Sequence, residues 1–167
     1  MAMEQKYRAL LSVAQQQQLP HVDNIRLCFQ MLSLTAAIDR DCAVQLAPHG
    51  LSEGRFILLF LLDNAPDGLA PAALAEQAGV TRATVTGLLD GLERDALIAR
   101  HADPVDRRAL CIRLTDTGKA LAAQVFEQHS RWIASLYASL TATEREQLST
   151  LLSKVAQHLP TQGTPTP

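Results

Sequence analysis

The sequence predicts a mainly α-helical chain with one short β-hairpin, and three observations point to this fold class. The apolar fraction is 47% while aromatic residues make up only 4%, so Leu, Ala, Val and Ile must build the core. Apolar residues recur at a helical period along most of the chain. One segment, 97–114, departs from that period and holds two strand-like runs around a polar tip. A length of 167 residues fits one domain or one subunit of a dimer.

Apolar positions at helical spacing predict seven helices. They cover residues 4–14, 22–46, 53–63, 71–78, 82–95, 116–140 and a last segment that opens after Thr143. For the N-terminal extension, 1–20, a disordered segment is the alternative to a helix, whereas the helix 53–63 is apolar enough to be buried on most sides. The expected N-caps are Asp23, Ser52, Thr81, Thr115 and Thr143, the last in a capping box with Glu146. The tail 160–167, rich in Pro and Thr, is expected to be disordered.

Two of these helices meet at a glycine in a helix-turn-helix pattern. Pro71 stands at a first helical position, where its fixed φ suits the start of a helix. Gly79 provides the turn, and the small residues Ala75 and Ala78 allow the two helices to cross closely. The second helix of such a pattern is the recognition helix, whose N-terminal residues enter the major groove of DNA.

A hairpin with an arginine tip follows this pattern directly. Its expected strands are 97–101 and 108–114, and the tip carries Asp106, Arg107 and Arg108. The minor groove of A·T-rich DNA is narrow and electronegative, so it attracts arginines placed in this way. Asp106 is expected to hold the guanidinium of Arg108 in position.

In this order, the pieces resemble the MarR family of winged-helix transcriptional regulators over residues 22–158. The motifs that carry the resemblance are Leu51-Ser52, Leu74-Ala75, Val80-Thr81 through Leu88-Leu89, Asp103-Pro-x-Asp-Arg-Arg and Leu114-Thr115-x-x-Gly118. The resemblance implies a winged helix-turn-helix domain at 51–114 and a helical dimerisation region formed by 21–50 and 115–159. It also implies an obligate homodimer, in most cases a repressor, that reads a pseudo-palindromic operator with half-sites about one DNA turn apart.

Charge and spacing select the residues expected to contact DNA. Residues 79–114 carry a net charge of +1 and residues 21–78 a net charge of −4, so binding must depend on a few placed arginines. Arg82 is the first candidate for a base contact, because Arg bidentate to guanine is the commonest specific pairing; a phosphate contact is the alternative. Thr84 and Thr86 could meet phosphate or a thymine methyl. The full expected set is Thr81, Arg82, Ala83, Thr84, Thr86, Asp106, Arg107 and Arg108.

The resemblance further implies control by a small molecule. Family members often bind small aromatic or phenolic acids between the dimerisation helices and the winged domain, which holds the recognition helices at a spacing that does not fit the operator. Arg55 or His49 could receive the carboxylate. The candidate cleft residues are Arg26, Gln30, Ser33, His49, Arg55 and Phe56. For each of them an exposed or structural side chain is the alternative interpretation.

Thiol sensing is the alternative mode of control. The segment Leu27-Cys28-Phe29 resembles the sensing-cysteine segment of the organic-hydroperoxide repressors within this family. An ungapped match puts Leu32, Cys42 and Glu53 where that subfamily has supporting tyrosines, so all three tyrosines are missing. A buried, structural Cys28 is therefore the default expectation. Cys28 and Cys42 would lie roughly 21 Å apart on one helix, too far for a disulfide bond.

Other classes of protein find less support. The chain has no nucleophile elbow, phosphate loop or cluster of His, Asp and Glu, so an enzyme, a cofactor and a metal site are not expected. The longest apolar run, Phe56 to Leu62, is too short to span a bilayer. The chain does not begin with a secretory signal pattern, and its three cysteines suit free thiols in the cytoplasm. A winged domain that docks on protein remains an alternative, but it would not explain the paired arginines at the hairpin tip.

Overall fold

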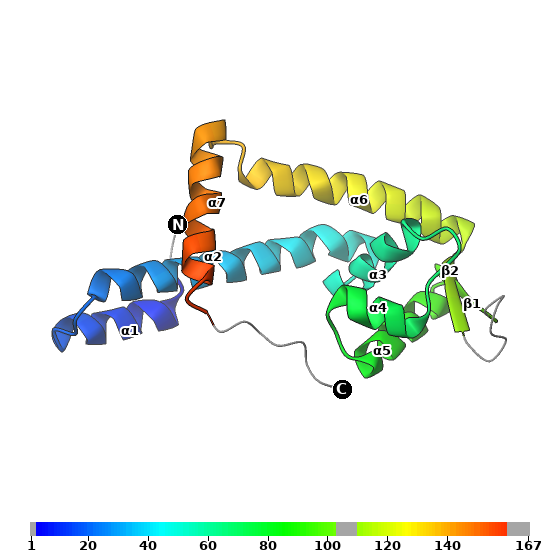
Figure 1. Cartoon of the computed structure of the whole chain (residues 1–167), viewed down its shortest axis with the longest axis horizontal. Coiled ribbons are helices and arrows are strands. Elements are labelled where there is room, and N and C mark those ends of the chain that lie inside the picture. The colour runs from blue at the N-terminus through cyan, green and yellow to red at the C-terminus, as the bar shows by residue number, and fades with distance from the viewer. Residues whose placement is uncertain (1–2, 103–109, 160–167) are drawn as a thin grey trace. The chain divides into compact units, whose positions relative to one another are not determined.

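The computed structural model describes residues 3–102 and 110–159 and confirms a mainly helical chain with a two-stranded antiparallel sheet (Figure 1). The helices are α1 (Gln5–Gln16), α2 (Val22–Leu46), the 3₁₀ turn η1 (Ala47–His49), α3 (Glu53–Asp63), α4 (Pro71–Ala78), α5 (Arg82–Arg94), α6 (Asp116–Leu136) and α7 (Ala142–Ala156). The strands are β1 (Ile98–Ala102) and β2 (Leu110–Leu114). The chain divides into two compact units, 1–126 and 127–167, and α6 runs across their boundary.

The N-terminal extension forms a helix that packs on α2. The Tyr7 ring stacks on the Phe29 ring with centroids 5.0 Å apart, and Leu11 of α1 is buried. The Glu4 backbone N–H donates to the Ser33 hydroxyl at 3.1 Å, which gives the buried Ser33 a partner. Because α1 contributes apolar and polar contacts alike, residues 5–16 are an integral part of the first unit.

The helix-turn-helix and the hairpin share one apolar core. Its fully buried side chains are Leu58, Leu59, Leu74, Val85, Leu89, Leu92 and Ile112. Burial of one such side chain contributes about 1.5–3 kcal/mol, so this core stabilises the domain far more than its surface contacts do. Pro71 begins α4 as expected, and Gly79 ends it with φ at 65°, a left-handed conformation that glycine adopts without steric cost.

The hairpin is antiparallel, with Ile98 opposite Leu114. Leu69 adds a bridge to Ile112 through two backbone hydrogen bonds of 2.9 and 3.0 Å, so the turn before α4 joins the edge of the sheet. The strands agree with the expected ranges to within two residues, except that the tip, 103–109, lies outside the described residues.

Thr115 and Gly118 connect the hairpin to α6 through very short contacts. The Gly118 N–H donates to the Thr115 hydroxyl at 3.0 Å, which confirms the expected N-cap, and that hydroxyl donates to the Ala96 carbonyl at 2.8 Å. Gly118 lies directly against the backbone of Leu97: a Cβ on Gly118 would stand 1.9 Å from the Leu97 carbonyl oxygen. The Thr-x-x-Gly motif therefore marks a backbone-to-backbone contact.

Two helix boundaries differ from the prediction. Helix α2 has His21 as its N-cap, in the left-handed region with φ at 61°, and Asp23 lies one residue inside the first turn. Asp23 still suits this position, because its carboxylate faces the positive end of the helix dipole. Helix α6 ends at Leu136 and not near Leu140, since the chain tightens there into three-residue turns such as Tyr137 N–H to Ala134 C=O at 3.3 Å.

The capping box of α7 also forms on a different pair of residues from the predicted one. The chain offers two overlapping Thr-x-x-Glu patterns, and the structure uses Thr141 with Glu144 where Thr143 with Glu146 was expected. The Glu144 N–H donates to the Thr141 hydroxyl at 3.3 Å, and the Thr141 N–H donates to the Glu144 carboxylate at 2.7 Å. The Thr141 hydroxyl also donates to this carboxylate at 2.8 Å, and the two bonds that the carboxylate accepts, the backbone one above all, lower the pKa of Glu144. The earlier pair wins because α6 ends early, which leaves room for two more residues of helix.

Helix α3 is less enclosed than its apolar sequence predicts. Ser52 caps it as expected, and Leu58, Leu59 and Leu62 are buried. Phe60, however, is 36% exposed and stacks on Phe126 of α6 with ring centroids 4.7 Å apart. The outer side of α3 thus carries an aromatic pair in place of a closed core.

Candidate nucleic-acid interface

Helix α5 has one buried side and one solvent-facing side, as a recognition helix requires. Val85, Leu89 and Leu92 face the core. The first turn is fixed by the Thr81 hydroxyl, which accepts from the Thr84 N–H at 3.2 Å. A helix held on one side by the core and capped at its N-terminus presents its first turn in a defined orientation.

The described residues of the expected DNA-binding set lie together at this end of α5. All of them are exposed: Thr81, Arg82, Ala83, Thr84 and Thr86. The remaining members, Asp106, Arg107 and Arg108, lie outside the described residues, as does the expected pairing of Asp106 with Arg108.

The hydroxyl contacts restrict what the threonines offer to DNA. The Thr86 hydroxyl donates to the Arg82 carbonyl at 3.0 Å, so its proton points back into the helix. The Thr84 and Thr81 hydroxyls are hydrogen-bonded to each other at 2.9 Å. A phosphate oxygen needs a donor, and in this rotamer the Thr86 hydroxyl already donates within its own helix.

Ion pairs attach the hairpin to α5, which the sequence analysis did not foresee. Arg100 of β1 pairs with Asp90 and, at 3.3 Å, with Glu93 of α5. Arg113 of β2 donates from its Nε to the Asp67 carbonyl at 3.0 Å. In the sequence, the sign that could have predicted the Arg100 pairs is two acids, Asp90 and Glu93, about one helical turn apart and shortly before the strand that carries Arg100. The Arg100 ion pairs connect β1 to α5, whereas the Arg113 hydrogen bond connects β2 to the turn before α4.

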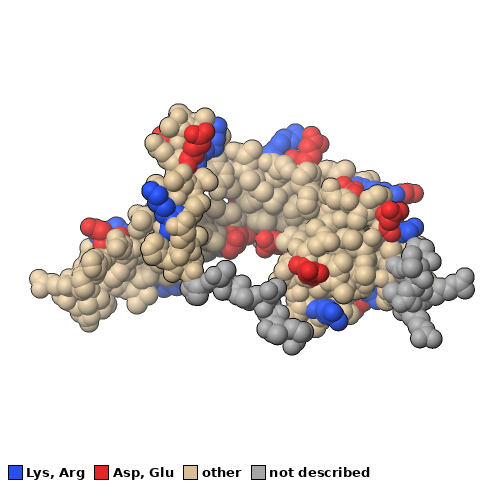
Figure 2. Space-filling view, viewed as in Figure 1, with Lys and Arg blue, Asp and Glu red and all other residues tan. Residues whose placement is uncertain are grey.

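The face of the protein drawn in Figure 2 carries mixed charge. On the face in Figure 2, Lys and Arg side chains alternate with Asp and Glu side chains, and uncharged residues cover most of the area. The dependence of DNA contacts on individually placed arginines stays a prediction.

Comparison with known proteins settles the family. Residues 49–109 match the MarR family profile. The HTH-type transcriptional repressor YetL of Bacillus subtilis is 31% identical over 155 residues, which cover 92% of this chain and 93% of YetL. The chain belongs to the MarR family.

Solved structures of MarR-family proteins share this fold. The Staphylococcus aureus MepR–DNA complex matches with a TM-score of 0.68 and 27% identity, covering 80% of this chain and 97% of MepR. The repressor CouR bound to a 23-mer DNA duplex matches with a TM-score of 0.66 and 29% identity, covering 78% of this chain and 92% of CouR. This MarR-family chain is accordingly a DNA-binding transcriptional regulator and not an enzyme.

The expected effector residues fall into two separate groups within the MarR chain. Arg26, Gln30 and Ser33 lie on the N-terminal half of α2, while the other three follow its C-terminal end. At 1.5 Å per residue, the thirteen residues from Ser33 to Leu46 span roughly 20 Å. Ser33 is buried under α1, and Arg26 lies 3.8 Å from Asp23. A single chain therefore does not bring the six residues into one cleft.

Arg55 is the most engaged of these residues. Its side chain is 18% exposed, and its guanidinium pairs with the Asp95 carboxylate. It also donates to the Gly50 carbonyl at 2.9 Å and to the Gly91 carbonyl at 3.3 Å. His49 and Phe56 are partly buried near the same turn. An incoming carboxylate would have to displace these partners of Arg55.

Cys28 is exposed on α2, which corrects the expectation of a buried thiol. Its neighbour Phe29 turns inward to Tyr7, so Cys28 is left on the outer side of the helix. Cys42 is buried, and burial raises the pKa of its thiol. Cys28 is therefore the more accessible of these two thiols in a single chain.

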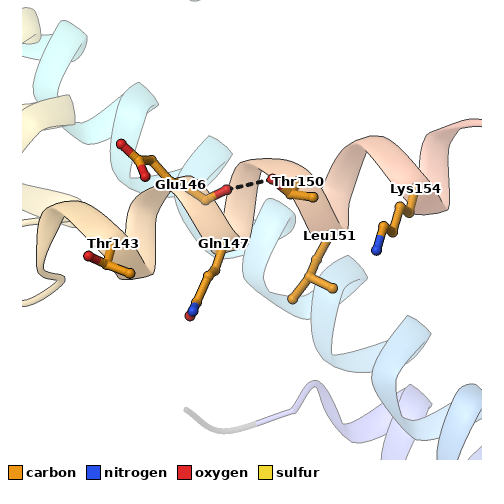
Figure 3. A pocket seen from close by; sticks show the side chains of 6 residues that line it. All are labelled: Thr143, Glu146, Gln147, Thr150, Leu151 and Lys154. Atoms are coloured by element: carbon orange, nitrogen blue, oxygen red, sulfur yellow. Dashed lines mark hydrogen bonds between the residues drawn. The ribbon is translucent and has the colours of Figure 1, made fainter.

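An open hollow of about 500 Å³ lies along α7 in the second unit (Figure 3). Its lining residues are Thr143, Glu146, Gln147, Thr150, Leu151 and Lys154. All of them come from one helix, and Thr150 donates back to the Glu146 carbonyl at 2.9 Å. Small-molecule sites enclose most of their ligand, which one helical face by itself does not do. Within residues 3–102 and 110–159, no group of three or more His, Cys, Asp or Glu is placed to hold a metal ion, and no helix is long and apolar enough to cross a membrane.

Proposed function

We propose that this protein is a cytoplasmic homodimeric repressor that binds a pseudo-palindromic operator and is released by a small aromatic or phenolic carboxylate. Each subunit would place the first turn of α5 in the major groove and Arg107 and Arg108 in the minor groove. The observation that carries the proposal is the exposed, capped end of α5 at 81–86 in a chain similar to MepR and CouR, both solved with DNA. The similarity to YetL, named a repressor, supports the sign of regulation.

The unpartnered apolar side chains support a dimer. In a single chain, α7 and the turn after it leave large apolar residues in solvent: Leu151, Leu152, Val155 and Leu159 are 59%, 44%, 47% and 66% exposed. In the first unit, α2 separately exposes the apolar residues Leu27, Leu32, Leu34 and Val44. Stable monomers rarely expose contiguous apolar area of this kind, so burial against a second copy is the expected role.

Replacing a DNA-contacting arginine should weaken operator binding without affecting the dimer. We expect Arg82→Ala and Arg108→Ala each to raise the operator Kd at least ~10-fold, because one good arginine contact to DNA is worth about 1–3 kcal/mol. Gel shift on the DNA upstream of the protein's own gene measures this change. Arg131→Ala, which removes an exposed charge on α6, serves as the control. Unchanged affinity in Arg108→Ala would remove the wing from the mechanism.

The same gel shift separates the two modes of control. We expect one member of a panel of aromatic acids to release the DNA, and Cys28→Ser to keep that response. The exposure of Cys28 favours the alternative of hydroperoxide sensing, since a redox sensor needs an accessible thiol. Release by an organic hydroperoxide, reversed by added thiol and lost in Cys28→Ser, would replace the effector hypothesis by the redox one.

A further inference from the structure

The guanidinium of Arg55 connects two segments that the chain separates by some forty residues. Arg55 stands in the first turn of α3 and donates to the Gly50 carbonyl in the turn that follows α2. With its other nitrogen it donates to the Gly91 carbonyl and pairs with Asp95, both at the C-terminal end of α5. One planar side chain thus links the end of the long helix α2 to the end of the recognition helix.

Small residues bring these segments together. A Cβ on Gly54 would lie 3.1 Å from a methyl carbon of Leu88, so glycine lets the start of α3 approach α5 closely. A Cβ on Gly91 would meet the Arg55 guanidinium at 3.8 Å, ordinary contact distance. The Arg55 guanidinium therefore lies at contact distance from the end of α5.

The electrostatics of this contact favour a fixed arrangement. The Gly91 carbonyl belongs to the negative end of the α5 dipole, where a cation is stabilising. Asp95 adds a full negative charge, and the low exposure of the Arg55 side chain reduces screening by solvent. Lysine carries the same charge but lacks the planar fork that reaches three acceptors at once.

We propose that Arg55 is a positioning residue for DNA binding, which fixes the angle of α5 to the turn after α2 without itself touching DNA. The contact lies nine residues from Arg82, roughly 13 Å along the helix, so a small rotation here displaces the first turn of α5 in the groove. The inference rests on the proposed DNA-binding function and adds to it a residue that acts through the helix and not on the operator.

The test compares binding to a specific and to a non-specific duplex. The wild-type protein first selects its preferred duplex from a random pool, and Kd is then measured for that duplex and for a scrambled one over a range of salt concentrations. We expect Arg55→Gln to raise the Kd for the selected duplex at least 10-fold and to leave the Kd for the scrambled duplex and the salt dependence unchanged. Non-specific binding depends on phosphate charge and not on the fit of α5. Arg55→Lys should not restore the loss.

Asp95→Asn provides a second, milder variant should Arg55→Gln fold poorly. It should shift specific binding in the same direction, and the double variant should lose no more than Arg55→Gln alone, because both act through one contact. Arg131→Gln, an exposed arginine of α6, is the matched control for loss of charge.

Two results would overturn the inference. If both affinities fall together and the salt dependence weakens, Arg55 is a phosphate contact. If neither affinity changes while the unfolding midpoint falls, its role is limited to stability. A wild-type protein that selects no duplex rejects the proposed DNA binding itself, which distinguishes that failure from failure of the Arg55 assignment.

Discussion

Gly118→Ala should lower the free energy of unfolding by at least about 3 kcal/mol. The added methyl group would stand 1.9 Å from the Leu97 carbonyl oxygen, closer than any non-bonded contact allows. Relief requires α6 to move away from the hairpin, which breaks the Thr115 bonds to Ala96 and Leu97 as well. Urea unfolding followed by circular dichroism, without DNA, measures the loss.

Gly87→Ala is the matched control for this substitution. Gly87 also lies in a helix, but a Cβ there has no neighbour within 4 Å. Alanine is a better helix former than glycine, so this variant should gain up to about 1 kcal/mol. If the two substitutions change the free energy of unfolding in opposite directions, the contact of Gly118 with Leu97, and not the loss of a glycine as such, accounts for the effect. A neutral Gly118→Ala variant would mean that α6 does not approach the hairpin so closely.

The double variant Leu152→Glu, Val155→Glu should convert the dimer to a monomer and weaken operator binding at least 100-fold. Leu152 and Val155 are 44% and 47% exposed in the single chain, so the substitutions remove only part of a buried apolar contact within it. In a dimer they would place carboxylates in an apolar interface, where an unpaired charge is costly. A monomer binds only one half-site of the operator, so it loses the gain in affinity that a dimer obtains from binding both half-sites at once. Analytical ultracentrifugation and gel shift report the two effects.

The control for the dimer experiment adds the same charge to the opposite side of α7. Thr150→Glu with Ser153→Glu has the same spacing along the helix, and both positions are exposed and polar. We expect this variant to remain dimeric and to bind operator. If the Leu152, Val155 variant also stays dimeric at low micromolar concentration, these two residues do not form the subunit interface.

Local rules explain which parts of the helical pattern were predicted well. Ser52, Thr81 and Thr115 were identified as N-caps because a hydroxyl three residues before a backbone N–H satisfies it in almost any tertiary context. The rule failed where the chain offered a choice: two Thr-x-x-Glu patterns compete before α7, and the early end of α6 decided between them. The prediction of Asp23 as an N-cap was wrong for a similar reason, since an acid is favourable both at the N-cap and in the first turn of a helix.

The candidate DNA surface was predictable for a related reason. A capped helix with an apolar side has its polar side fixed by geometry, so Thr81, Arg82 and Thr86 could be placed on the exposed side of α5 from spacing alone. The ion pairs of Arg55 and Arg100 could not, because each joins residues of different elements that only packing brings together. Cys28 was misplaced because α1, whose folding the sequence left open, decides which side of α2 is covered.

By itself, the sequence determined the helical fold class, the order of its elements, the exposed turn of α5 and the family, because these depend on periodicity, caps and short motifs. The tertiary structure decided the close approach of Gly118 to the Leu97 backbone, the arginines that are held in ion pairs and the face of α2 that is exposed to solvent. These properties depend on distances between segments remote in the chain, and packing sets such distances through the combined shape of many side chains.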